Sequence, residues 1–265
     1  TAYTSFTYAG AGLGITLEGK YTKNFRFRND PFQIGVQGQM NFLPPMARQN
    51  TFRLPARFSP NTQELGEQGG QLDIRYAINK SVSVGLNVSD IYQLDGTELY
   101  REIAPELTYK YKRKWQVLAG LQILKYNIAV YQGKDSYVDA VTPYVEWLYK
   151  FTARKSLRVE AQYLNTDDEF GSWAFLLAEF GWAPHWLIYA SNMYKIEHAN
   201  KEAFPREKTR FDGLHYPTVG VVYTHRANRF SIAYVKQVEG INCAGGICRY
   251  EPTFHGVRLQ LSSSF

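Results

Sequence analysis

The stretch Ser81-Val82-Ser83-Val84-Gly85-Leu86-Asn87-Val88-Ser89 decides the fold class of this chain. Every even position is apolar, and every odd position is small or polar. Such alternation predicts a β-strand with two unlike faces, because successive side chains of a strand point to opposite sides of its sheet. The preceding stretch, residues 71–78, alternates in the same way and places the charged Asp73 and Arg75 on its polar side.

The same alternation recurs along the whole chain in about fifteen segments. They are residues 2–9, 12–21, 32–43, 51–58, 71–78, 81–89, 101–111, 115–125, 137–151, 157–164, 173–183, 186–195, 213–224, 229–238 and 253–265. Strands of soluble proteins are mostly about 5–6 residues long, whereas a tilted strand that crosses a bilayer needs about 9–11. Most of these segments have the greater length.

The connections between the segments alternate in length. Short ones lie at 10–11, 79–80, 112–114, 184–185 and 225–228, with slightly longer ones at 44–50 and 152–156. Longer ones lie between them, at 22–31, 59–70, 90–100, 126–136, 165–172, 196–212 and 239–252. Short periplasmic turns and longer extracellular loops are typical of outer-membrane barrels, whereas a soluble β-sandwich, the alternative, has no reason to sort its loops.

We therefore predict an all-β fold, an antiparallel transmembrane β-barrel of about 14–16 strands that forms a single domain over residues 1–265. The pattern places the start of the chain at the long-loop end and its last strand at the short-turn end. Bacterial barrels have an even number of strands. We therefore expect at least one strand before Thr1, which also fits a chain without an initiator Met or a signal peptide.

Charged residues of the strands are expected to face the lumen, because each would cost about 2–4 kcal/mol at mid-depth on the lipid side. These residues are Glu18, Lys20, Arg53, Arg57, Asp73, Arg75, Glu106, Lys110, Glu146, Lys150, Arg158, Glu160, Glu179 and Arg258. Both signs are present, so ion pairs within the lumen are expected. Pro105, Pro143 and Pro217 also fall within predicted strands, and we expect irregular pairing there because each removes one ladder donor.

The composition fits this interpretation. Tyr, Phe and Trp make up 15% of the chain, which suits both strands and a membrane interface. No apolar stretch approaches the roughly 20 residues of a spanning helix, so a helical membrane protein is excluded. The net charge of +6 is spread along the chain. We therefore expect no nucleic-acid partner, and the surplus is compatible with a lipopolysaccharide-rich surface.

The two cysteines, Cys243 and Cys248, are separated by four residues that include Gly245 and Gly246. This spacing favours a small disulfide loop, which implies an oxidising compartment. A two-cysteine metal site is the alternative, but neither His nor further Cys residues lie nearby. None of the five His residues has metal-ligand spacing, and neither a metal nor a cofactor is expected.

The chain ends on Phe265 after the alternating residues 257–262. In outer-membrane barrels a C-terminal aromatic residue commonly serves as the signal read by the assembly machinery, and we predict that role for Phe265. No Gly-x-Ser-x-Gly motif is present, so an enzyme is not expected. A catalytic pair at the barrel rim remains open, because such pairs are recognised by geometry and not by spacing.

Several stretches resemble a family of large, uncharacterised outer-membrane β-barrels of the Bacteroidota. They are Arg48–Phe52, Ser59–Thr62, Gly69–Tyr76 and, most specifically, Val235–Tyr250 with its two cysteines. The resemblance extends to Phe265 and covers the chain in weaker form. It implies the barrel fold and a location in the bacterial outer membrane, and it carries no established activity. Members of that family are longer than 265 residues, which fits the expectation of a missing N-terminal portion.

Two functions follow as expectations, and a membrane-embedded enzyme is a third alternative. The first is a non-enzymatic accessory or structural subunit of an outer-membrane protein assembly or secretion complex, which has other outer-membrane proteins or lipoproteins as partners. The alternative is a passive pore or uptake channel, since about sixteen strands leave an aqueous lumen unless something fills it. The long, charged loop 196–212 is the predicted candidate for folding inward.

Overall fold

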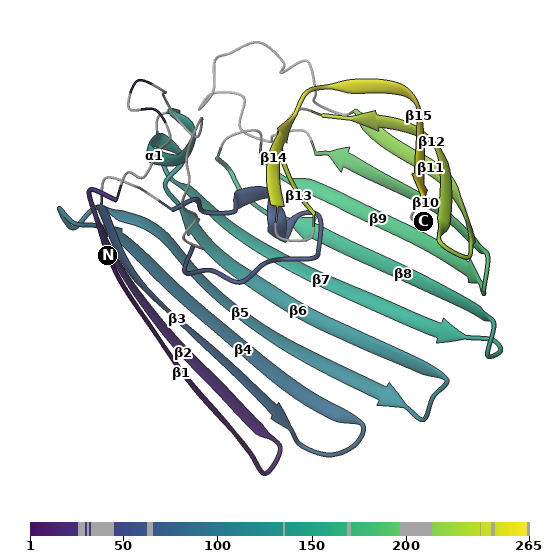
Figure 1. The fold of residues 1–265 in the computed structure, drawn as a ribbon, viewed down its shortest axis with the longest axis horizontal. Helices are drawn as coiled ribbons and strands as arrows, with labels where there is room; N and C mark the ends of the chain where they lie inside the picture. Colours follow the sequence, from purple (N-terminus) through teal and green to yellow (C-terminus); the bar gives the residue numbers. More distant parts are fainter. Residues whose placement is uncertain are drawn as a thin grey trace.

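A computed structural model of the chain shows an all-β protein with almost no helix (Figure 1). It describes residues 1–25, 30, 32, 45–62, 66–134, 136–168, 171–196, 214–238, 240–244 and 247–263. The helical elements are η1 (Pro55–Phe58) and α1 (Ile128–Gln132). The strands are β1 (Ala2–Gly10), β2 (Leu13–Lys23), β3 (Gly66–Ala77), β4 (Val82–Gln93), β5 (Glu98–Tyr111), β6 (Trp115–Tyr126), β7 (Val138–Lys150), β8 (Lys155–Leu164), β9 (Trp173–Trp182), β10 (Trp186–Lys195), β11 (His215–His225), β12 (Asn228–Gln237), β13 (Gly240–Ala244), β14 (Ile247–Glu251) and β15 (Phe254–Ser263).

Thirteen strands form one antiparallel sheet in which neighbours in sequence are neighbours in space, from β1 through β12 to β15. The strands β13 and β14 pair only with each other and form a separate hairpin between β12 and β15. The sheet is curved, and β1 and β15 lie at its two edges (Figure 1). The prediction of an all-β antiparallel fold is thus confirmed. The sheet of the described residues has thirteen strands, fewer than predicted, and it is not closed.

Short turns lie at one end of the sheet, where they join β1 to β2, β3 to β4, β5 to β6, β7 to β8, β9 to β10 and β11 to β12. The connections at the other end are longer, apart from residues 94–97, where β4 and β5 extend further than predicted. Ala2 pairs with Tyr21 near a long connection, and Ser263 pairs with Asn228 beside a short turn. The predicted sorting of the connections, and the predicted ends at which β1 begins and β15 stops, are therefore confirmed.

The predicted strand over residues 51–58 is wrong. The chain there forms an irregular segment that ends in the short helix η1. Pro55 lacks the backbone donor that a central strand requires, and the alternating apolar residues Phe52, Leu54, Ala56 and Phe58 are buried. The predicted short turn at 44–50 is also wrong, because residues 51–58, which it was to join to the preceding strand, form no strand. The predicted strand over 32–43 lies outside the described residues, except for Phe32 in a turn.

The three strand prolines interrupt the hydrogen-bond ladder, as predicted. Pairing between β5 and β6 skips Pro105. The ladder between β7 and β8 stops next to Pro143, beyond which only the isolated bridge between Val141 and Asn165 is formed. Pairing between β11 and β12 likewise begins just after Pro217. Each proline still has a partner on its other side. This is the result expected for a residue that has a carbonyl group but no N–H to donate.

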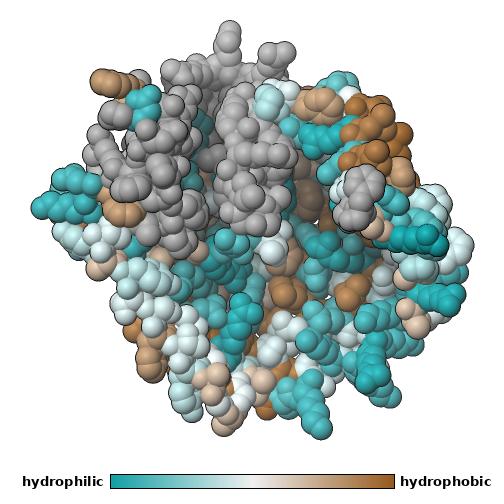
Figure 2. Space-filling model, in the orientation of Figure 1, coloured by the Kyte–Doolittle hydropathy of each residue, from teal (hydrophilic) through white to brown (hydrophobic). Residues whose placement is uncertain are grey.

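The two faces of the sheet differ in polarity. The directly opposed side chains of Ile103, Ile123 and Val141 are 39–44% exposed on one face, which we call the outer face. Other large apolar side chains exposed along the same rows are Leu17, Leu107, Val145, Trp147, Leu176, Ile188, Val219, Ile232 and Leu259. The opposite face, which we call the inner face, carries polar side chains such as Glu102 and Gln122. The view in Figure 2 shows mostly hydrophilic residues over the strands.

Candidate functional site

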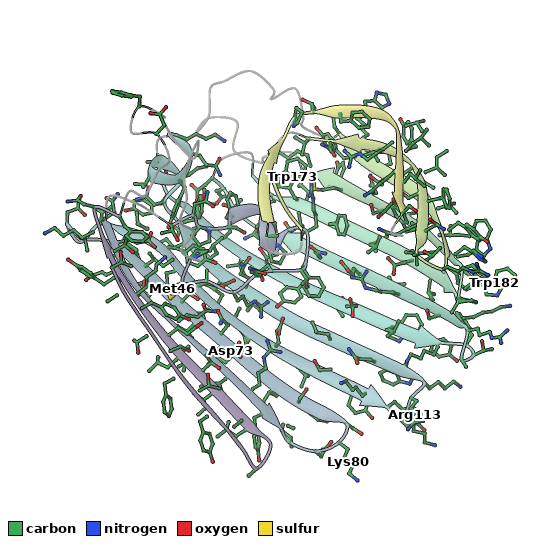
Figure 3. All side chains as sticks on the ribbon, viewed as in Figure 1. Met46, Asp73, Lys80, Arg113, Trp173 and Trp182 are labelled. Carbon is green, nitrogen blue, oxygen red and sulfur yellow. The ribbon has the colours of Figure 1, made fainter. Side chains whose placement is uncertain are left out.

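The most elaborate set of side-chain contacts joins residues 45–62, which we call the inner segment, to the inner face of the sheet. The inner segment contains η1 and crosses in front of the strands in Figure 1, and its Met46 is labelled in Figure 3. Met46, Leu54 and Phe58 are each at most 2% exposed and belong to one buried apolar cluster with residues of β4–β11. Burial of side chains of this size stabilises a structure by roughly 1.5–3 kcal/mol each.

Arg48 anchors the beginning of the inner segment. Its Nη2 lies 3.0 Å from Glu106 Oε1 on β5 and donates to Tyr144 Oη on β7 at 2.7 Å. Tyr144 in turn donates to the same Glu106 oxygen at 2.7 Å. The three groups therefore form a closed triangle across two strands and the inner segment. Burial acts to lower the pKa of Arg48, but Tyr144 and Glu106 raise that pKa more, so the guanidinium stays charged.

Polar side chains of the sheet supply hydrogen bonds that the irregular backbone of the inner segment cannot obtain from a neighbouring strand. Gln162 Oε1 on β8 accepts from the backbone N–H of Leu54 at 2.8 Å. Gln122 Nε2 on β6 donates to the Pro55 carbonyl at 3.3 Å and to Glu102 Oε1 at 2.6 Å. Buried backbone groups are costly when left unpaired, so these glutamines favour this one position of the inner segment.

Aromatic contacts hold the remainder of the inner segment. The rings of Phe52 and Tyr144 have centroids 4.4 Å apart, and those of Phe58 and Tyr126 are 5.5 Å apart. The guanidinium of Arg57 lies over the ring of the buried Trp173 on β9, 4.9 Å from its centroid. Contacts of this kind add about 0.5–1.5 kcal/mol each beyond the burial of their area.

A fully buried ion pair closes the other end of the inner segment. Lys20 Nζ on β2 lies 2.5 Å from Glu67 Oε1 on β3, and both side chains have no exposed area. The same ammonium donates to Thr62 Oγ1 at 2.9 Å. Breaking a buried pair by removing one partner typically costs about 3–5 kcal/mol. The pair therefore fixes where the chain enters β3.

A second charged cluster lies on the inner face and is linked to the inner segment, because Gln162 donates to Glu160 Oε2 at 2.8 Å and also accepts from Leu54. Arg158 on β8 contacts Glu160, lies 2.7 Å from Glu146 on β7 and lies 3.6 Å from Glu179 on β9. One cation thus bridges three acidic residues on three adjacent strands. This arrangement matches the ion pairs that were expected from the mixed signs of the strand charges.

The structure places twelve of the fourteen predicted lumen residues on strands, on the polar inner face. They are Glu18, Lys20, Asp73, Arg75, Glu106, Lys110, Glu146, Lys150, Arg158, Glu160, Glu179 and Arg258. The prediction was wrong for Arg53 and Arg57, because both lie on the inner segment and not on a strand. Whether the inner face lines a lumen stays a prediction.

The sequence analysis did not identify most of the residues that join the inner segment to the sheet. They are Arg48 and Asn50 on the segment and Glu67, Glu102, Gln122, Tyr144 and Gln162 on the strands. One available signal was Pro55, which is incompatible with a central strand. Another was the set of uncharged amides on the polar sides of β6 and β8, which have the donors and acceptors that an irregular backbone needs.

A cavity of about 250 Å³ lies beside the inner segment on the inner face. Its charged lining residues are Arg53, Lys236 and Arg258, and no acidic side chain among the described residues lines it. Lys236 Nζ lies over the Tyr216 ring at 5.3 Å, and Arg258 Nη2 donates to Gln237 Oε1 at 3.3 Å. The cavity is therefore positively charged and partly aromatic.

The remaining predicted site residues lie near the margins of the described structure. Cys243 on β13 and Cys248 on β14 occupy directly opposed positions of the hairpin, and their disulfide stays a prediction. Phe265 lies outside the described residues, as does nearly all of the loop 196–212. Within the described ranges, no group of three or more His, Cys, Asp or Glu side chains is placed to hold a metal ion. No described helix has the length and apolarity needed to cross a membrane.

Comparison with protein-family profiles identifies the family to which the chain belongs. The profile of a family of unknown function, DUF6029, matches residues 1–265. No curated protein matches the sequence.

Proposed function

We propose that this chain, which belongs to the DUF6029 family, is an integral β-barrel protein of the bacterial outer membrane. Within that membrane we assign it a structural or accessory role in a protein assembly or secretion complex, without enzymatic activity and without an open channel. The protein would then be surrounded by outer-membrane lipid and lipopolysaccharide, and its partners would be other outer-membrane proteins or lipoproteins. The sequence resemblance to large barrels of the Bacteroidota supports the same location.

The unlike faces of the sheet support the membrane assignment. The strands of the sheet are 9–14 residues long, close to the about 9–11 that a tilted strand needs to cross a bilayer. Large apolar side chains are exposed in continuous rows on the outer face, for example Leu107 at 46% and Leu176 at 55%. Water would disfavour such rows, whereas lipid solvates them.

The single observation that carries the accessory role is the inner segment. It packs against β5, β6, β7, β8 and β9 through buried side chains, glutamine hydrogen bonds and the Arg48–Glu106 pair. A diffusion pore keeps its interior open to water, whereas here the protein's own chain covers the part of the inner face that carries these contacts. The geometry therefore favours a filled barrel that serves as a scaffold.

The edges of the sheet support association with further strands. The outer-face residues Phe6 on β1 and Leu259 on β15 are 64% and 75% exposed, and among the described residues each of these strands pairs on one side only. Unpaired backbone groups at a sheet edge are not tolerated in the hydrocarbon region. For the sheet to span a bilayer, additional strands must therefore pair with β1 and β15, and barrel closure is part of the proposal.

The test combines purification and conductance. Protein extracted from outer membranes in mild detergent is analysed by mass spectrometry for partners, and the same preparation is reconstituted in planar bilayers. Stoichiometric co-purification with a large complex, without steady conductance, is the expected result. Steady conductance without partners would instead support the pore, and failure to fractionate with the outer membrane would refute the membrane assignment.

A further inference from the structure

The short-turn end of the sheet is strongly cationic. Its turns and the adjoining strand ends carry ten Lys and Arg residues: Lys80, Lys110, Lys112, Arg113, Lys114, Lys150, Arg154, Lys155, Arg226 and Arg229. We call this set the basic rim. No Asp or Glu occurs in the same stretches, residues 8–15, 76–84, 108–117, 148–157, 181–188 and 222–231, all of which the structure describes. Since the whole chain has a net charge of only +6, positive charge is concentrated at this end.

Part of the basic rim surrounds a cavity of about 880 Å³ between the turns that follow β5, β7 and β9. Its charged lining residues are Arg113, Lys114, Lys150, Arg154 and Lys155, and no acidic side chain of the described part of the chain lines it. Arg113 and Lys80 are labelled at this end in Figure 3, with Trp182 nearby. Five cations around one hollow repel each other, so an anion bound there would lower their electrostatic energy.

Aromatic side chains form the apolar part of the same cavity. Phe151, Trp182 and Trp186 line it, and the two tryptophans are 52% and 44% exposed. Lys155 Nζ lies 5.1 Å from the Trp182 ring centroid, and Lys114 Nζ lies 5.7 Å from that of Tyr149. The cationic and aromatic surfaces are therefore in direct contact.

The aromatic surface continues along the outer face at this end. Ring contacts link Trp147 to Tyr149 at 5.6 Å, Tyr149 to Phe151 at 4.9 Å and Phe151 to Phe180 at 6.4 Å. Aromatic rings in such a belt sit at headgroup level at a membrane interface, and Lys and Arg near the surface attract anionic lipids. A soluble anion would need only the cations, whereas a lipid also uses the apolar exit toward the outer face.

We propose that this cavity binds the phosphate of an anionic phospholipid headgroup, such as that of phosphatidylglycerol, while the acyl chains lie against Trp182, Trp186 and the outer face. The inference rests on the proposed membrane function. It adds a specific lipid site to the barrel, in the leaflet next to the short turns. Lys114, Arg154 and Lys155 recognise the lipid by its single phosphate.

The test compares two triple variants of the full chain that carry the same change in charge. The cavity variant is Lys114→Gln, Arg154→Gln and Lys155→Gln. The control variant is Lys80→Gln, Lys112→Gln and Arg226→Gln, which removes three rim cations that do not line the cavity. Each protein is inserted into phosphatidylcholine vesicles with and without phosphatidylglycerol. Quenching of tryptophan fluorescence by brominated forms of each lipid then gives the relative affinity at the cavity.

We expect the parent protein to prefer phosphatidylglycerol, and the cavity variant to lose that preference by at least about tenfold. The control variant should retain most of it. Equal losses in both variants would show diffuse attraction and overturn the proposal. Binding of inorganic phosphate as tight as that of the lipid would also overturn it, because the aromatic surface would then contribute nothing. Failure of all proteins to insert into either vesicle would refute the proposed function itself, whereas insertion without lipid preference refutes only the site.

Discussion

Replacing Arg48 by Met should weaken the attachment of the inner segment to the sheet without unfolding the sheet. The substitution keeps most of the side-chain volume but removes the ion pair with Glu106 and the hydrogen bond to Tyr144. Losing one partner of a buried pair costs about 3–5 kcal/mol. The side chains of Arg48 and Glu106 are 15% and 21% exposed, so solvent moderates the loss, and we expect about 2–4 kcal/mol.

The backbone amide of Leu54 reports this weakening directly, because it donates to Gln162 Oε1 and not to a neighbouring strand. A loss of about 2–4 kcal/mol should speed its hydrogen exchange by about 30- to 700-fold. The amide of Ile123, in the ladder between β5 and β6, is the internal control and should change little. The Arg48→Met variant should also show intermittent conductance in planar bilayers, because the inner segment then leaves the inner face part of the time.

A double-mutant cycle separates the ion pair from general damage. Glu106→Gln alone should also accelerate exchange at Leu54, while the Arg48→Met and Glu106→Gln double variant should lose clearly less than the sum of the two single losses. Strict additivity, or equal acceleration at Leu54 and Ile123, would refute the view that this pair anchors the inner segment.

Two further substitutions test the packing and the faces of the sheet. A methyl group at Gly120 would overlap the ring of Tyr144. Gly120→Ala should therefore lower the free energy of unfolding by about 1–3 kcal/mol, whereas Gly85→Ala, whose nearest neighbour atom would be 3.7 Å away, should be nearly neutral in chemical denaturation. Ile232→Arg on the outer face should lower the free energy of unfolding in vesicles by about 2–4 kcal/mol. The same change at the adjacent inner-face residue Ser231 should cost much less, and equal effects would contradict the assignment of the faces.

The strands and their faces were predictable from sequence because the alternation is a local property. The polar Glu106 and its apolar neighbour Leu107 point to opposite faces of the sheet, whichever strands lie beside β5. The lengths of the connections likewise depend on nearby residues, and their sorting to two ends was correct except at 44–50 and 90–100. Closure of the sheet is not a local property, because it depends on which strand pairs with β1 and with β15.

The inner segment was not predictable by the same reasoning. Phe52, Leu54, Ala56 and Phe58 alternate as in a strand, but they are buried under tertiary contacts that no periodicity reveals. Their partners lie far away in sequence, as in the hydrogen bond from Leu54 to Gln162 on β8. Pro55 was the one local sign against a strand, since it cannot donate to a ladder.

The position of the inner segment also restricts where a solute could cross the protein and which charges it would meet. The polar anchors of the segment are on β5, β6, β7 and β8, and Arg57 contacts Trp173 on β9. The described cavity on the inner face lies instead beside β9–β12 and β15 and is lined by Arg53, Lys236 and Arg258 without an acidic residue. A solute crossing there would meet a positive surface, so any residual conductance should favour anions. Cation-selective conductance in the parent protein would mean that the inner segment does not hold the position described, and the argument for a filled barrel would fail with it.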